Sequence, residues 1–232
     1  MIDFNDKRQV AKAIQFTNVN PNLTKEGLIK HLDICMQYNF QAAMIAPCYI
    51  KLAKEVLKGT EIEVASTLNF PQANDTLSMK LAALKEMIKE GVDQFDFPPN
   101  PGLLIGGYEI EYFKEMKEIT DLAHANGVIV KSMLEFGFLN NEQKIKATKL
   151  AYEAGIDWVK QSSGWGIGGC EATVDDVKIL KENILPPCRV KVSGKVNSLD
   201  KMRILFEAGA ELVGTSSGPA IVDGLIGDSN AY

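Results

Sequence analysis

Short apolar runs alternate with helix-like segments along almost the whole of this chain, and that alternation constrains its fold more than any other feature. Eight runs have the length and composition of buried strands: residues 13–17, 42–46, 63–68, 94–97, 128–134, 157–161, 189–193 and 212–214. Helical periodicity fills the intervals, most clearly at 77–90, 109–125 and 142–154. Strands that alternate with helices form parallel sheets, and eight such units in 232 residues predict a (β/α)8 TIM barrel.

Three of the predicted helices end in similar turns, with Gly91, Gly155 and Gly209 placed shortly before the next strand. Glycine is favoured there because a helix commonly ends in a left-handed residue. The recurrence indicates repeated helix-to-strand units in a single domain that spans residues 1–232. Periodicity does not reveal whether the sheet closes, so an open, doubly wound sheet is the alternative fold.

The composition limits the partners and the location that we expect for this protein. A net charge of −5 disfavours nucleic acid or an anionic membrane as the main partner. Four cysteines without CxxC spacing and only two histidines argue against a zinc site and a disulfide framework, and we expect neither a metal nor a cofactor. No apolar run reaches the length of a membrane span, and the first residues lack a signal-peptide pattern, so we expect a cytoplasmic protein.

Two lysines occupy equivalent positions in successive strand-like runs. Lys160 ends the run at 156–160, where a pocket would surround its amine and favour the neutral, nucleophilic form. Lys191 stands in the next run, so the two are expected on adjacent parallel strands. Neighbouring ammonium groups oppose each other's protonation, and the pairing predicts Schiff-base chemistry. For either lysine, the alternative is a side chain that reaches solvent or pairs with a carboxylate.

Polar residues stand at the ends of other predicted strands as well. Asp96 lies between two phenylalanines, and near two lysines it is a candidate proton shuttle. The alternative is a buried aspartate satisfied by a lysine or by the backbone. Lys131 is expected to pair its charge with Asp96, and Thr17 closes the first strand as a supporting residue. On a barrel, the carboxyl ends of the strands form the catalytic face.

Three loops rich in small residues follow the last three predicted strands. They are Ser162-Ser163-Gly164, Ser193-Gly194-Lys195 and Gly214-Thr215-Ser216-Ser217-Gly218. The last loop precedes an apolar stretch, 219–222, that has the pattern of a short helix. Backbone amides at a helix N-terminus hold phosphate, and barrels frequently build a phosphate site from the loops after strands seven and eight. These loops therefore predict a phosphorylated small-molecule ligand.

The chain resembles the deoxyribose-phosphate aldolase family over about residues 13–220. The resemblance is carried by Val159-Lys160-Gln161-Ser162-Ser163-Gly164-Trp165-Gly166, by Asn69-Phe70-Pro71 and by the loop that begins at Gly214. It implies a TIM barrel in which Lys160 forms the Schiff base, Lys191 perturbs it and Asp96 relays protons. It also implies phosphate binding by Gly194, Ser216 and Ser217, and the same loops add Ser162, Gly164 and Lys195 to the candidate substrate contacts.

The chain departs from that family at several positions. Gln15 stands where the family usually carries an aspartate, and Lys195 where a second glycine usually follows the serine. Gln161 replaces a threonine, and Met44 stands where a cysteine is common. These departures bear on the recognition of phosphate and acceptor, whereas the two lysines and the aspartate are retained.

The reaction that this resemblance implies is that of a class I aldolase. It cleaves 2-deoxy-D-ribose 5-phosphate to acetaldehyde and D-glyceraldehyde 3-phosphate. The alternatives are a related Schiff-base aldolase for another aldehyde or sugar phosphate, and a barrel that binds a sugar phosphate without turnover. The sequence leaves open whether the chain forms a homo-oligomer and what Tyr232 does.

Overall fold

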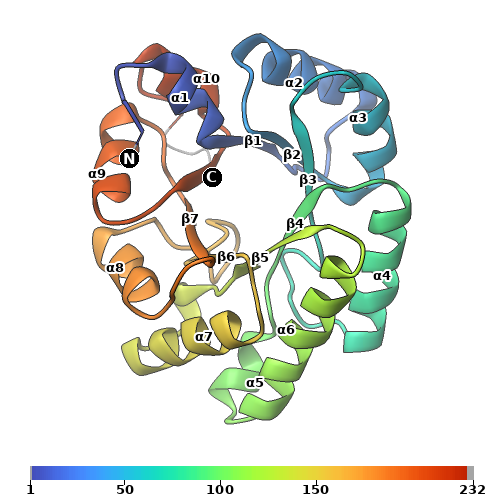
Figure 1. Cartoon of the computed structure of the whole chain (residues 1–232), viewed down its shortest axis with the longest axis vertical. Coiled ribbons are helices and arrows are strands. Elements are labelled where there is room, and N and C mark those ends of the chain that lie inside the picture. The colour runs from blue at the N-terminus through green and yellow to red at the C-terminus, as the bar shows by residue number, and fades with distance from the viewer. Residues whose placement is uncertain (1, 229–232) are drawn as a thin grey trace.

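Eight parallel strands close into a barrel in sequence order in the computed structural model, which describes residues 2–228 (Figure 1). The strands are β1 (Ile14–Asn18), β2 (Ala42–Ile45), β3 (Glu63–Thr67), β4 (Gln94–Phe97), β5 (Ile129–Met133), β6 (Trp158–Lys160), β7 (Arg189–Ser193) and β8 (Leu212–Thr215). The last strand pairs with the first, with Gln15 opposite Gly214. That pairing excludes the open sheet, and the TIM-barrel prediction is confirmed.

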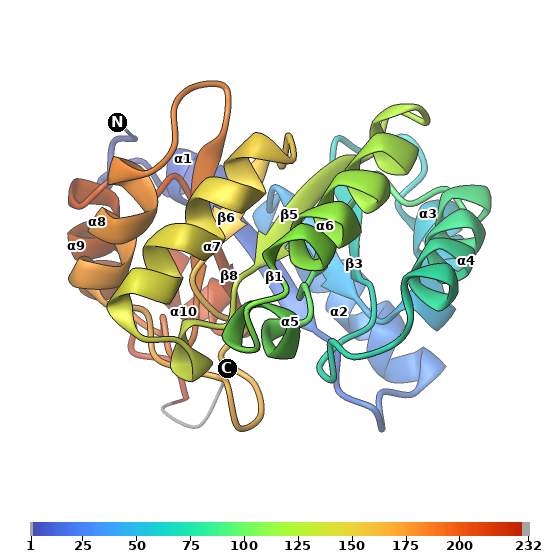
Figure 2. The same ribbon diagram turned by 90° about the horizontal axis from the view of Figure 1, so that it is seen from below.

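Helices surround this barrel on its outside, as Figure 2 also shows. They are α1 (Lys7–Lys12), α2 (Lys25–Tyr38), α3 (Ile50–Val56), α4 (Leu77–Lys89), α5 (Pro101–Ile105), α6 (Glu109–His124), α7 (Asn141–Glu153), α8 (Val174–Glu182), α9 (Leu199–Glu207) and α10 (Gly218–Asp223), with the short 3₁₀ turns η1 (Pro47–Tyr49) and η2 (Phe136–Phe138). Within residues 2–228, none of these helices is long and apolar enough to cross a bilayer.

Local sequence signals explain where several helices begin and end. Thr24, Thr76 and Ser198 each precede a helix and accept a hydrogen bond from a backbone N–H of its first turn. Asn140 begins α7 with a reciprocal capping box. The three predicted turn glycines after α4, α7 and α9 all have positive φ, at 92°, 87° and 121°, so that prediction is confirmed.

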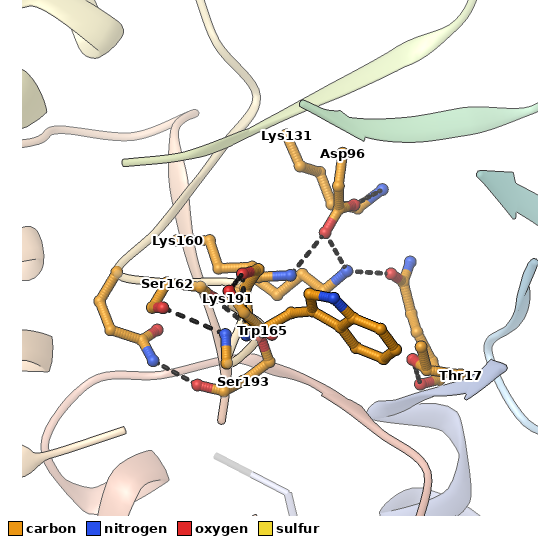
Figure 3. Close-up of polar contacts among 12 residues, drawn as sticks. Thr17, Asp96, Lys131, Lys160, Ser162, Trp165, Lys191 and Ser193 are labelled. Atoms are coloured by element: carbon orange, nitrogen blue, oxygen red, sulfur yellow. Dashed lines mark hydrogen bonds and ion pairs between the residues drawn. The ribbon is translucent and has the colours of Figure 1, made fainter. Parts of the chain in front are cut away.

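Strand residues alternate between the barrel interior and the helices outside. Phe95, Val159 and Val190 are fully buried in the apolar core between the barrel and the helices. Their neighbours Asp96, Lys160 and Lys191 point the other way and meet in the interior (Figure 3). Many interior positions are therefore polar, and the closure of the barrel brings side chains from distant parts of the sequence into contact.

Candidate active site

The carboxylate of Asp96 joins the two predicted lysines at the carboxyl ends of the strands. Lys160 Nζ donates to Asp96 Oδ2 at 2.9 Å, and Lys191 Nζ donates to the same oxygen at 2.7 Å (Figure 3). The two lysines are opposite each other in the β6–β7 register. All three side chains are buried. The predicted placement of the lysines on adjacent strands is confirmed, and one carboxylate bridges their amines.

The electrostatics of this cluster follow from burial and from the excess of lysines. Burial alone would raise the pKa of Asp96, but the charges of Lys191, Lys160 and Lys131 outweigh it and hold that pKa well below its usual range. Burial lowers the pKa of Lys191 well below its ordinary value; Asp96 opposes this shift, whereas the other two lysines add to it. Asp96 is therefore a carboxylate at neutral pH.

Lys131 is the third cation beside Asp96, and it is fully buried. Its Nζ lies 3.7 Å from Asp96 Oδ1, an ion-pair distance that is too long for a hydrogen bond. Within the described part of the chain, neither of these two atoms has a hydrogen-bond partner. Burial is the main cause that lowers the pKa of Lys131 to about 8. The charge pairing expected from the sequence is present, and it acts at ion-pair distance.

A cavity of about 360 Å³, part of it open to solvent, lies over the cluster. Lys160, Lys191 and Asp96 contribute to its lining, and Lys131 does not. Its other lining residues are Thr17, Val19, Met44, Thr67, Phe70, Met133, Ser163, Ser193 and Gly214. Its walls are largely apolar with a few convergent polar groups, which is the composition of a small-molecule site. Thr17, which was expected to support the site, and Met44, which stands where the family commonly has a cysteine, therefore both face the space in which a ligand would bind.

Glu135 holds the loop after β6 in place, a role that the sequence did not reveal. Its buried carboxylate accepts hydrogen bonds from Ser162 Oγ at 3.0 Å and from the backbone N–H of Ser163 at 3.1 Å. Burial raises the pKa of Glu135, and these hydrogen bonds oppose the shift. Because the loop begins one residue after Lys160, the Glu135 contacts fix the backbone next to the candidate nucleophile.

We expect Glu135→Ala to loosen that loop. Buried donors on Ser162 and Ser163 would lose their acceptor, which should lower the free energy of unfolding by about 1–3 kcal/mol. A misplaced Lys160 should also reduce kcat/KM about tenfold. Urea unfolding and steady-state kinetics measure both effects, with the exposed Glu153 replaced by alanine as a matched control. Parent-like stability and kinetics would show that Glu135 does not position the loop.

The residues predicted to bind phosphate lie in the loops after β7 and β8. Gly194 has φ +98°, and a Cβ there would collide with the carbonyl oxygen of Cys170. A Cβ on Gly164 would lie 2.6 Å from Gly194 Cα, so the loops after β6 and β7 pack backbone against backbone. Thr215 Oγ1 donates to the carbonyl oxygen of Val196 at 2.7 Å and joins the loop after β7 to that after β8.

The candidate phosphate contacts differ in their exposure. Ser217 is buried and directly precedes α10. Ser216 is half-buried, and Lys195 is exposed with φ +54°. Gly194, Lys195, Ser216 and Ser217 do not line the cavity over the lysines. A phosphate site in these loops would therefore lie beside that cavity, and it stays a prediction.

An aromatic pair also stands next to the cavity. Phe70 lines it, and the Trp165 ring meets the Phe70 ring edge-on with 6.0 Å between centroids. Trp165 belongs to the loop after β6, and Figure 3 draws it in the same close-up as Lys160 and Lys191. The sequence placed both aromatics in recognised motifs without predicting that they touch.

Curated relatives can be aligned with nearly the full length of this chain. Deoxyribose-phosphate aldolases of Thermococcus gammatolerans and Thermococcus kodakarensis are 39% and 38% identical to it, over 93% and 94% of this chain and 96% and 98% of their own. That of Clostridium perfringens is 36% identical over 97% of this chain and 99% of its own. No protein-family model matches the chain.

Solved structures share the same fold. The deoxyribose phosphate aldolase of Aeropyrum pernix, described as having a unique tetrameric structure, superposes with a TM-score of 0.86 at 23% identity, over 94% of this chain and 92% of that one. A structure described as QR15, an aldolase, also gives a TM-score of 0.86, at 26% identity over 92% of this chain and 94% of that one.

The fold, the pocket and these relatives define a TIM-barrel enzyme of the lyase class. Its buried lysines and carboxylate lie at the carboxyl ends of the strands, where barrel enzymes carry their active sites. Identity of 34–39% over more than nine-tenths of the chain fixes the family. The chain belongs to the deoxyribose-phosphate aldolase family.

Proposed function

We propose that this protein is a class I aldolase that cleaves 2-deoxy-D-ribose 5-phosphate through an imine on Lys160. One observation carries the proposal: Lys160 lines the cavity and donates to Asp96 Oδ2 at 2.9 Å, which puts a nucleophile and a proton-transfer group side by side. Lys191 also lines the cavity, but it donates both to Asp96 and to Gln15 Oε1. Lys191 is therefore held as a hydrogen-bond donor, and Lys160 is the better candidate to attack.

The proposed reaction starts from the open-chain sugar. The neutral amine of Lys160 adds to the aldehyde carbon, and Asp96 relays protons so that the carbinolamine oxygen leaves as water. Cleavage of the bond between C2 and C3 releases glyceraldehyde 3-phosphate; the proton of the C3 hydroxyl passes to a base and the bonding electron pair forms an enamine on Lys160. Protonation of the enamine carbon and hydrolysis of the resulting iminium release acetaldehyde and regenerate the amine.

Substrate contacts are proposed on the loops that follow β6, β7 and β8. Ser162 and Gly164 shape the loop next to Lys160, and Thr17 faces the cavity from β1. Gly194, Ser216 and Ser217 are proposed to bind the phosphate through small side chains and backbone amides that an anion can approach closely. Lys195 is proposed to add an ammonium group beside the same anion.

The activity is tested by incubating the protein with 2-deoxyribose 5-phosphate and measuring the acetaldehyde and the triose phosphate that are released. Equal amounts of both products, formed without any added metal or cofactor, are expected. Binding of the sugar phosphate without product formation would favour the alternative of a barrel that binds without turnover.

The Lys195→Gly variant tests whether the natural substrate carries a phosphate group. Lysine with positive φ is strained by about 1–2 kcal/mol, so glycine should raise the free energy of unfolding by roughly 1 kcal/mol. If Lys195 contacts phosphate, KM for the phosphorylated sugar should rise about tenfold, while KM for 2-deoxyribose stays unchanged. Steady-state kinetics on both sugars measure this. A lower KM for the phosphorylated sugar in the variant would mean that Lys195 excludes phosphate, and another aldehyde would become the proposed substrate.

Other expectations from the sequence also remain proposals. We also propose a single domain over residues 1–232, a cytoplasmic location and a homo-oligomer, and sedimentation velocity tests the last of these. Tyr232 lies outside the described residues.

A further inference from the structure

Four polar side chains fill the barrel interior on the side of the lysines away from the cavity. Gln15 of β1 and Gln94 of β4 are buried, with 0% and 1% of their surface exposed. Glu63 of β3 and Gln41, which directly precedes β2, are half-buried. A second cavity of about 540 Å³, part of it open to solvent and lined in part by Gln41, Glu63 and Gln94, opens at the amino ends of the strands. These four residues therefore lie between Lys191 and the opposite mouth of the barrel.

Hydrogen bonds join the four side chains to Lys191 in an unbroken series. Lys191 Nζ donates to Gln15 Oε1. Gln15 Nε2 donates to Gln41 Oε1 at 2.8 Å and to Gln94 Oε1 at 2.6 Å. Gln41 Nε2 donates to Glu63 Oε2 at 2.6 Å, and Gln94 Nε2 donates to the same oxygen. Gln94 Nε2 also donates sideways to Gln41 Oε1 at 3.3 Å, and every other bond in this series points from Lys191 towards Glu63.

The hydrogen-bonding groups of Glu63 and Lys191, at the two ends of the series, determine the direction of donation between them. A carboxylate accepts hydrogen bonds and donates none, so Gln41 and Gln94 must turn their Nε2 atoms to Glu63. Their Oε1 atoms then face Gln15, which must present its own Nε2. The Oε1 of Gln15 is left for Lys191, whose Nζ donates to it. The orientation of the Gln15 amide is thus set from the far end of the barrel.

We propose that Glu63 is a positioning residue for Lys191, which it orients through the amides of Gln41, Gln94 and Gln15. The inference rests on the proposed role of Lys191 beside the imine-forming lysine. Without the Glu63 carboxylate, the amides can rotate and place Gln15 Nε2, a donor, against Lys191 Nζ. With it, Lys191 keeps a neutral acceptor on the side away from Asp96, and its amine stays next to Lys160.

The surroundings of Lys191 determine the direction in which its pKa should change when Glu63 is replaced. Asp96 faces its amine from β4, Lys131 from β5 and Lys160 from β6, and burial together with the two lysines already disfavours its ammonium form. Losing the Gln15 acceptor removes a contact that favours this form, so the pKa of Lys191 falls further. If catalysis requires the Lys191 ammonium, the alkaline limb of the pH–rate profile moves to lower pH.

The test compares Glu63→Met with Glu63→Gln in the full-length protein. Methionine removes the acceptor, and we expect kcat to fall about tenfold with KM nearly unchanged, and the alkaline limb to move down by about one pH unit. The isosteric Glu63→Gln keeps an oxygen that can accept from both amides, so it should restore most of the loss. Glu61→Met, which alters an exposed carboxylate two residues away, is the matched control.

A double-mutant cycle distinguishes orientation from a general effect on packing. In a Gln15→Met background, Glu63→Met should cause no further shift of the alkaline limb, because its route to Lys191 is already broken. Additive shifts, or an unchanged limb in Glu63→Met, would overturn the inference.

A second readout does not depend on turnover. The side-chain amide protons of Gln15, measured by ¹⁵N-edited NMR, should exchange slowly in the parent and in Glu63→Gln, and faster in Glu63→Met. Unchanged exchange in Glu63→Met would overturn the inference. A parent that shows this exchange pattern but cleaves no sugar phosphate would overturn the proposed function alone.

Discussion

Replacing Lys160 with methionine is expected to reduce kcat to the background rate, a loss of about 10⁵-fold or more. Methionine fills nearly the same space but cannot add to a carbonyl carbon, so the imine cannot form. The side chain lines the cavity and lies 2.9 Å from the proposed proton relay. Steady-state kinetics on 2-deoxyribose 5-phosphate measure the loss.

The fold should survive that substitution, because it removes a buried cation from a cluster that holds an excess of them. The melting temperature is expected to stay at or above that of the parent. Lys149→Met, which changes an exposed lysine of α7, is the matched control and should keep full activity. Substantial turnover by a folded Lys160→Met protein would show that another amine forms the imine.

Asp96→Asn is expected to have the second largest effect, on stability as well as on rate. The substitution leaves Lys131, Lys160 and Lys191 buried without a counter-charge, which should lower the free energy of unfolding by about 3–5 kcal/mol at neutral pH. The loss should shrink as the pH rises, because the lowered pKa values of Lys131 and Lys191 let these two side chains lose their protons. Without the proton relay, kcat should fall about 10²–10⁴-fold.

The parent should show the matching pH dependence in acid. The pKa of Asp96 is lowered in the folded protein from its ordinary value of 3.8. Its contribution to stability is therefore present above that value and is lost as the pH falls through the folded pKa. Urea unfolding between pH 3 and pH 9 compares the parent with Asp96→Asn, and with Asp33→Asn as an exposed control. A difference below about 1 kcal/mol at neutral pH would contradict an ion cluster centred on Asp96.

Much of the barrel could be predicted from the sequence because its signals are local. The strands Gln94–Phe97 and Arg189–Ser193 were predicted with the bounds that the structure has, and the others agree within one residue at each end. The turn glycines were recognisable because their positive φ restricts the residue type. The pairing of Lys160 with Lys191 followed from equivalent positions on successive parallel strands. Closure of the barrel depends on residues far apart in the sequence, and only the pairing of β8 with β1 establishes it.

The contacts that the sequence did not reveal join side chains from distant strands. Glu135 follows β5 by two residues and was visible as a polar residue near a strand end, but its bonds to the loop after β6 depend on a left-handed backbone at that residue, with φ +47°. Gln15 was visible only as a departure from the family pattern. Its contacts with Gln41 and Gln94 require a closed barrel that brings β1, β4 and the residue before β2 together in the interior.

The most direct test of the proposed chemistry is to trap the imine and locate it. The protein is incubated with acetaldehyde, reduced with borohydride and digested, and the modified peptide is identified by mass spectrometry. We expect one two-carbon adduct per chain, on Lys160, and none in Lys160→Met. A stoichiometric adduct on Lys191, on Lys131 or on a surface lysine, with Lys160 unmodified, would contradict the account.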